Sequence, residues 1–133
     1  VIPALLMKAH QAQLHGQPFT VWGTGWPRRE FMYVDDLADA LVFLLKNYSD
    51  EKPVNVGCGQ DIPIRELAEK IASVTGYRGE IVYDASKPDG VQRKLLDTSR
   101  LFEQGWSPRV SLEEGLSRTY DWYLSRLEAL EAA

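Results

Sequence analysis

The stretch DDLADALVFLLKN, residues 35–47, constrains the fold more than any other part of the chain. Its leading Asp35 and Asp36 suit a helix start, because a carboxylate can cap unpaired backbone N–H groups and favours the positive end of the helix dipole. After Asp39 the helix is apolar almost all round. A surface helix shows one apolar stripe, so this helix is expected to have protein against more than one side.

Two other stretches have the apolar spacing and the stop signals of helices. Residues 1–16 place Pro3 in a first turn and Gly16 at the C-terminal stop. Residues 63–76 repeat apolar side chains at helical spacing and stop at Gly76. The side chains expected to face the core are Leu5, Leu6 and Ala9 in the first helix, and Ile64, Leu67, Ala68 and Ile71 in the second.

The C-terminal part predicts a longer helix over residues 111–130. Ser111 and Glu114 have the spacing of a capping box at its start. One face of this helix carries Leu112, Leu116, Tyr120, Tyr123, Leu127 and Leu130.

Short strands are expected between the helices. Residues 17–34 predict a strand, a glycine-rich turn and a second strand, and residues 52–59 and 79–84 predict one strand each. Within residues 83–106 a charged loop precedes a further strand and a short helix. The predicted class is mixed α/β, with short strands and about five helices.

Composition narrows the class of protein. A chain of 133 residues suits a single domain, 1–133, and 44% hydrophobic and 26% charged residues are ordinary for a globular protein. The net charge of −4 argues against general nucleic-acid binding. No apolar run has membrane-spanning length, and no signal-peptide pattern opens the chain. A single cysteine makes a reducing compartment the default, so the predicted location is the cytoplasm.

Known catalytic and metal motifs are absent from the sequence. The segment VGCGQ, residues 56–60, lacks the third glycine of a dinucleotide-binding loop. Cys58 has no base near it in sequence, which favours a packed thiol over a nucleophile. His10 and His15 share no helix face and have no metal-ligand spacing, so both are predicted to be ordinary surface residues.

Two stretches carry residues that suit a phosphorylated ring compound. Trp22 and Trp26 flank the glycine-rich turn, and Arg29 follows shortly after. Arginine binds phosphate with two hydrogen bonds and tryptophan offers a flat face to a base or sugar. In the charged loop, Lys87 suits phosphate and Asp89 suits hydroxyl or amino donors. On spacing alone, a plain turn and a solvated loop explain these stretches as well.

Taken together, these segments resemble the C-terminal portion of extended short-chain dehydrogenase/reductases that act on nucleotide sugars. The resemblance rests on VIPALL (residues 1–6), VWGTGWPRREFMYVDDLADA (21–40), NVGCG (55–59) and above all YDASKPDGVQRKLLD (83–97). The last motif is similar to the branch that forms GDP-L-fucose. The resemblance implies an NADPH-dependent enzyme that epimerises GDP-4-keto-6-deoxy-D-mannose at C3 and C5 and then reduces C4.

The resemblance also implies a set of substrate-binding residues. Lys8 and Arg29 would face the diphosphate, and Trp22 would line the sugar and diphosphate pocket. Asp89 would accept hydrogen bonds from the nucleoside, and Lys87 would add positive charge. Position 8 is Lys where some members of the branch carry Arg, which keeps the charge and loses the two-pronged hydrogen bonding.

The family's cofactor loop, reduction machinery and epimerisation residues would all lie N-terminal to Val1. The chain is therefore expected to be a truncated, substrate-binding domain that lacks catalytic residues and binds NADP only as part of the intact enzyme. Its expected partners are the missing Rossmann half, a GDP-sugar and a second copy of itself, with no nucleic acid and no membrane. Two alternatives stay open: a stand-alone nucleotide-sugar-binding or interaction module that docks through residues 35–47, and a nucleotide-sugar epimerase or dehydratase of different substrate.

Overall fold

In the described residues, five helices and five short strands make up the mixed α/β fold that the sequence predicts. The computed structural model describes residues 1–131, apart from the side chains of 128, 130 and 131. The helices are α1 (Ile2–His15), α2 (Val34–Asn47), α3 (Ile64–Thr75), α4 (Ser99–Glu103) and α5 (Leu112–Glu131). The strands are β1 (Phe19–Trp22), β2 (Arg28–Glu30), β3 (Asp61–Pro63), β4 (Ile81–Asp84) and β5 (Arg93–Lys94).

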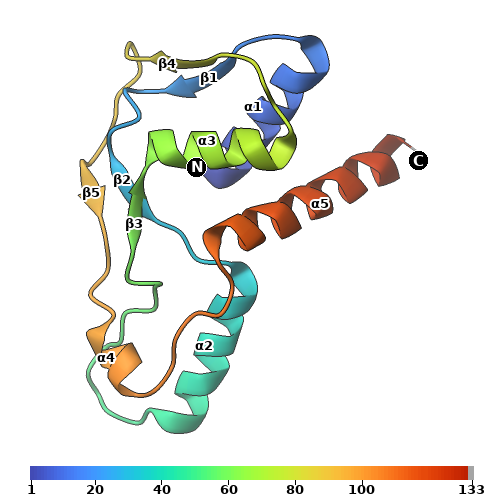
Figure 1. Ribbon diagram of the computed structural model, residues 1–133. Helices are drawn as coiled ribbons and strands as arrows, with labels where there is room; N and C mark the ends of the chain where they lie inside the picture. The colour runs from blue at the N-terminus through green and yellow to red at the C-terminus, as the bar shows by residue number, and fades with distance from the viewer. Residues whose placement is uncertain (132–133) are drawn as a thin grey trace.

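The strands form two small sheets. β1 pairs in parallel with β4, with Phe19 opposite Ile81 and Trp22 opposite Asp84. β2 lies in the middle of the other sheet, antiparallel to β3 and parallel to β5. The two strands that flank the glycine-rich turn therefore enter different sheets, as Figure 1 shows.

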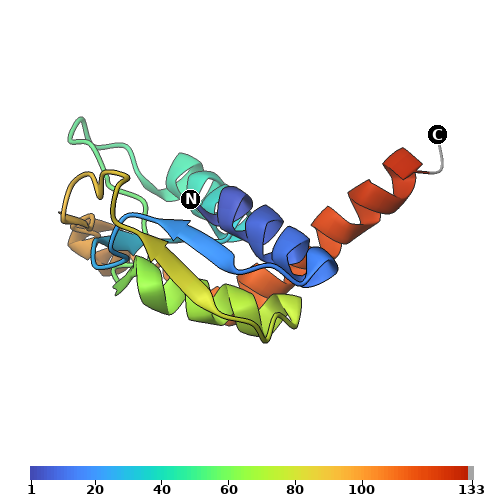
Figure 2. The same cartoon turned by 90° about the horizontal axis from the view of Figure 1, so that it is seen from above.

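Helices α1 and α3 pack against each other and lie on one side of the β1–β4 pair, below the two strands in Figure 1; Figure 2 shows the same arrangement from above. Both helices end as predicted, at Gly16 with φ 62° and at Gly76 with φ 74°, in the left-handed conformation that glycine adopts without strain. Their apolar faces, together with the first half of α5, build the main core. Its largest fully buried side chains are Leu6, Phe19, Val21, Leu67, Ile71 and Leu116.

The core-facing predictions for α1 and α3 are confirmed, with Ile64 only partly buried. In α5, Leu116 and Tyr120 are buried while Leu112 and Tyr123 are partly buried. The side chain of Leu130 lies outside the described residues. One half of the predicted capping box forms, since the backbone N–H of Glu114 donates to Ser111 Oγ at 3.2 Å. The Glu114 carboxylate instead pairs with Arg118.

The start of α2 differs from the prediction. Its N-cap residue is Tyr33, with no side-chain capping bond. Asp36 is 5% exposed, and its Oδ2 accepts hydrogen bonds from the backbone N–H groups of Arg109 and Val110. Asp36 therefore joins α2 to the chain before α5. The sequence did not predict this role, because those N–H groups come within reach of Asp36 only in the folded chain.

That α2 has protein against more than one side stays a prediction, because the described chain leaves most of this helix exposed. Only Asp36 and Ala40 are buried in this helix. Leu41, Val42 and Leu45 are 55%, 50% and 85% exposed. The described part of the chain thus covers only one side of α2, through a second small core of Ala40, Leu101 and Trp106.

Two further predictions are wrong. Residues 52–59 do not form a strand; Val54 and Val56 pack against the second core, and the chain enters β3 only at Asp61. His10 is not an ordinary surface residue, because its Nδ1 lies 2.9 Å from the hydroxyl of Tyr120 on α5. In both cases a contact with a distant segment decided the outcome. His15 is exposed, as predicted.

Candidate functional site

Four of the five predicted binding residues line one cavity of about 210 Å³. They are Lys8, Trp22, Arg29 and Asp89, together with apolar residues of α1, β1 and α3. The parallel pairing of β1 with β4 explains why they meet. The carboxyl ends of the two strands share one edge, so the turn after Trp22 and the loop after Asp84 lie together there.

Two lysines lie beside the indole of Trp22. Lys8 Nζ is 4.4 Å from the ring centroid and Lys87 Nζ is 5.7 Å from it. Lys8 also donates to the backbone oxygen of Thr20 at 3.3 Å, which keeps its ammonium group at β1. Trp22 is 63% exposed, so a ring with two cations against it is open to solvent. Lys87 therefore joins the predicted group although it does not line the cavity.

Arg29 and its neighbour Arg28 have different partners. Arg28 Nε donates to Asp61 Oδ1 at 2.8 Å, whereas Arg29 Nη1 donates to the backbone oxygen of Arg28 at 2.7 Å. Within residues 1–127, Arg29 forms no ion pair with a carboxylate. Lys8 and Arg29 thus bring positive charge to the cavity and form no ion pair among the described residues.

Asp89 supplies the opposite charge at the same cavity. Its Oδ1 accepts a hydrogen bond from the backbone N–H of Thr24 at 2.6 Å, and its Oδ2 accepts one from the Thr24 hydroxyl at 2.7 Å. Gly23, with φ 84°, packs so closely against Asp89 Oδ1 that a Cβ would overlap it. The charged loop is therefore fastened to the glycine-rich turn.

The far side of the same turn is held by Arg65 of α3. The Arg65 guanidinium stacks on Trp26 at 3.9 Å and on Tyr83 at 4.9 Å, and its Nη2 donates to the backbone oxygen of Thr24 at 3.3 Å. A Cβ on Gly25 would lie 2.7 Å from the Tyr83 ring. Neither Thr24 nor Arg65 is prominent in the sequence, because their partners are distant along the chain. The close spacing of Gly23 and Gly25 in the sequence is the local signal of a tightly packed turn.

The acidic residue at the end of β4 is held as an anion. Hydrogen bonds from the side chain and backbone of Ser86 keep the pKa of Asp84 below its usual range, and Lys87 and Lys8 lower that pKa further. The charged loop therefore begins with a fixed negative group beside the two lysines. Among the described residues, no cluster of three metal-ligating side chains is found.

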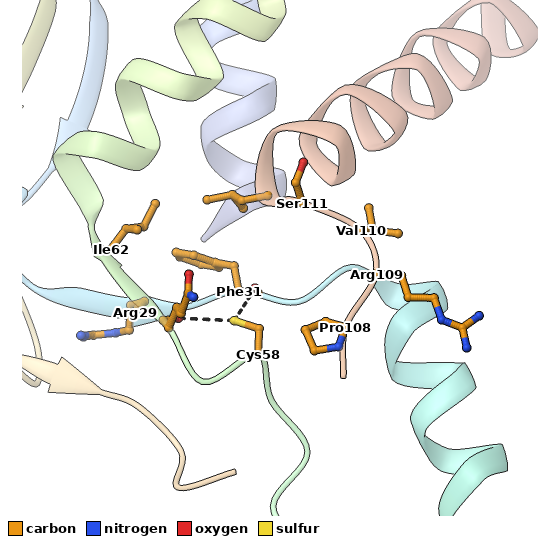
Figure 3. A pocket seen from close by; sticks show the side chains of 10 residues that line it. Arg29, Phe31, Cys58, Ile62, Pro108, Arg109, Val110 and Ser111 are labelled. Atoms are coloured by element: carbon orange, nitrogen blue, oxygen red, sulfur yellow. Dashed lines mark hydrogen bonds between the residues drawn. The ribbon is translucent and has the colours of Figure 1, made fainter. Parts of the chain in front are cut away.

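A second cavity, of about 340 Å³, lies on the other side of Arg29, between Phe31, Cys58 and the chain before α5. Figure 3 shows the guanidinium of Arg29 pointing away from Cys58. The Cys58 thiol donates to the backbone oxygens of Phe31 and Gln60, and burial raises its pKa. A thiol that stays protonated is a poor nucleophile, which agrees with the interpretation of Cys58 as a packed residue.

Known proteins are similar to this chain in sequence. Residues 1–57 match the NAD dependent epimerase/dehydratase family. The chain is 54% identical, over 96% of its length, to GDP-L-fucose synthase 1 of Arabidopsis thaliana, and 48% identical, over 93%, to GDP-L-fucose synthase of Escherichia coli. This chain resembles the C-terminal portion of GDP-L-fucose synthase, an extended short-chain dehydrogenase/reductase.

The fold supports the same relationship. The chain superposes with a TM-score of 0.90 on a GDP-L-fucose synthetase from Naegleria fowleri bound to NADP, at 29% identity and over 96% of its length. It spans about 40% of the length of the GDP-L-fucose synthases it matches. Within residues 1–131, no helix combines the length and the apolar character needed to cross a membrane.

Proposed function

We propose that this chain is the GDP-sugar-binding domain of a GDP-L-fucose synthase. The observation that carries the proposal is the cavity that brings together Lys8 of α1, Trp22 of β1, Arg29 of β2 and Asp89 of the loop after β4. Lys8 and Arg29 bind the diphosphate, Trp22 lines the pocket beside it, and Lys87 adds charge at the rim. Asp89 accepts hydrogen bonds from hydroxyl or amino groups of the nucleoside.

The distribution of charge supports this orientation of the ligand. A diphosphate is attracted to Lys8 and Arg29 and repelled by the Asp89 carboxylate, while nucleoside donors are attracted to that carboxylate. A GDP-sugar carries both kinds of group a few bonds apart. The cavity therefore suits a nucleotide better than it suits phosphate alone.

The reaction we propose belongs to the intact enzyme. There, the keto-sugar GDP-4-keto-6-deoxy-D-mannose is epimerised at C3 and C5 and reduced at C4 with NADPH. The described residues supply substrate contacts and no complete dinucleotide loop, so NADP is expected to bind only together with a Rossmann half. Mixed with the keto-sugar, this chain alone is expected to leave NADPH unconsumed, and turnover measured by absorbance at the NADPH band would contradict that assignment.

Nucleotide titrations test the binding proposal directly. GDP, UDP and dTDP are titrated into the chain while heat release and tryptophan fluorescence are followed, because Trp22 borders the cavity. GDP is expected to bind more tightly than the other two. Tighter binding of UDP or dTDP would favour the alternative of an epimerase or dehydratase of different substrate, and no binding of any of them would remove the proposal.

A second role, self-association, is favoured by the exposed side of α2. Leu41, Val42 and Leu45 give this helix apolar surface that the described chain leaves uncovered. We propose that two copies associate through it, since such patches drive association. Light scattering at micromolar concentration is expected to give a mass above that of one chain, and Leu45→Lys is expected to lower it. A wild-type monomer would contradict this role.

A further inference from the structure

Thr24 is the residue that orients the Asp89 carboxylate. Its backbone N–H and its hydroxyl each bind a different oxygen of that carboxylate, at 2.6 and 2.7 Å. The Thr24 hydroxyl oxygen also accepts a hydrogen bond from the backbone N–H of Trp26 at 3.3 Å. The Thr24 hydroxyl oxygen thus accepts from Trp26, and the one proton of this hydroxyl is donated to Asp89.

A carboxylate has about four lone-pair positions, and Thr24 occupies one on each oxygen. Asp89 also lines the cavity, so the remaining positions can accept hydrogen bonds from a ligand there. No basic side chain forms an ion pair with Asp89 in the part of the chain that the structure describes. Two neutral donors therefore set the direction of the carboxylate and leave its negative charge in place.

We infer that Thr24 is a positioning residue that makes the cavity selective for ligands with hydroxyl or amino donors next to a diphosphate. This inference rests on the proposed binding of a GDP-sugar. Without the Thr24 hydroxyl, the carboxylate loses one of its two fixed contacts and can turn away from the nucleoside. The hydrogen bonds of the cations Lys8 and Arg29 go to the backbone oxygens of Thr20 and Arg28 and do not involve Thr24, so the diphosphate end of the cavity is expected to be unchanged.

Two substitutions and two probes separate this role from a general structural one. Thr24→Val keeps the shape and the backbone N–H but removes the hydroxyl donor, whereas Thr24→Ser keeps the hydroxyl and removes a methyl group. GDP offers donors on its ribose and base together with a diphosphate, whereas pyrophosphate offers only the charge and the acceptors. Affinities of both probes for the wild-type chain and for each variant are measured by calorimetry, after circular dichroism has shown that each variant is folded.

Thr24→Val is expected to weaken GDP binding about tenfold, the usual effect of a lost hydrogen bond to a charged group. The affinity of Thr24→Val for pyrophosphate is expected to stay within about twofold of wild type, because the cations that bind the diphosphate are kept. Thr24→Ser is expected to bind both GDP and pyrophosphate within about twofold of wild type, because the hydroxyl donor to Asp89 is kept. Unchanged GDP affinity in Thr24→Val, equal loss of both probes, or a serine variant as weak as the valine variant would each overturn the inference. A wild-type chain that binds neither probe would instead refute the proposed function, and the inference with it.

Discussion

Arg28 and Arg29 are neighbours on β2, yet they belong to two regions that differ in how a positive charge is partnered: by a carboxylate in one region and by backbone oxygens in the other. In the sheet of β3, β2 and β5, Arg28 and Arg93 both pair with Asp61, whose side chain is 3% exposed. At the cavity beyond β1, Arg29 and Lys8 have backbone oxygens as partners. Successive side chains of a strand point to opposite faces, which separates the two arginines.

The comparison distinguishes a cation that holds the fold together from one that can bind a ligand. Arg28 and Arg93 come from strands that are far apart in sequence, and the shared Asp61 joins both to β3. Arg29 and Lys8 bring charge into the cavity and form no ion pair with a carboxylate of the described residues. An anion that enters the cavity therefore does not compete with an existing ion pair.

Replacing each of the two arginines separately by alanine is the strongest test of this distinction. Arg29→Ala is expected to lower GDP affinity by about 2 kcal/mol, or roughly thirtyfold, because charge-assisted hydrogen bonds to the diphosphate are lost. Its melting temperature is expected to change little. Arg28→Ala, the matched control, is expected to lower the melting temperature and leave GDP affinity near wild type. The reverse pattern would show that the roles of the two arginines are misassigned.

Asp61→Asn is expected to produce the next largest effect, a fall of several degrees in melting temperature at neutral pH. A hydrogen bond from Arg93 lowers the pKa of Asp61, and a hydrogen bond from Arg28 lowers it further by a smaller amount. A carboxyl group with a lowered folded pKa stabilises the fold above its unfolded pKa, near 4, and loses that contribution as pH falls through the folded value.

Thermal melts between neutral pH and pH about 3 check this assignment. The difference in melting temperature between wild type and Asp61→Asn is expected to shrink on acidification. Asp84, Asp97 and Glu113 also have lowered pKa values but are present in both proteins, so the comparison isolates Asp61. A difference that stays constant with pH would mean that the charge of Asp61 contributes nothing.

Ionic strength is expected to weaken GDP binding severalfold between about 50 and 500 mM salt, because exposed charges are screened over shorter distances. The melting temperature of the chain without ligand is expected to move much less over the same range. Calorimetry at each salt concentration measures the affinity. Binding that is insensitive to salt would argue against a diphosphate held by Lys8 and Arg29.

Glu113→Gln is expected to have the smallest effect. The Glu113 carboxylate accepts a hydrogen bond from Lys70 at 2.6 Å and joins α5 to α3, but it is 59% exposed. An exposed ion pair of this kind contributes about 0.5 kcal/mol or less. Urea denaturation measures the change in the free energy of unfolding, and a loss as large as that of Asp61→Asn would remove the distinction between the two ion pairs.

The sequence by itself predicted most of the helices and the residue types at the cavity. Gly16 and Gly76 end their helices as predicted, and α3 buries the expected apolar face. These features depend on neighbours within a few residues, since helix periodicity and glycine conformation are local properties. The resemblance that singled out Lys8, Trp22, Arg29, Lys87 and Asp89 likewise rested on short motifs.

Only the tertiary structure decided which of these residues meet and which are already paired. Thr24 lies 65 residues from Asp89, and Arg28 lies 33 residues from Asp61, so no local pattern shows either contact. The same reason explains the failed strand at residues 52–59 and the role of Asp36, whose partners follow it by more than 70 residues. A charged side chain becomes part of the fold or part of a binding site according to the partner that folding brings to it, and that partner is set by the packing of distant segments.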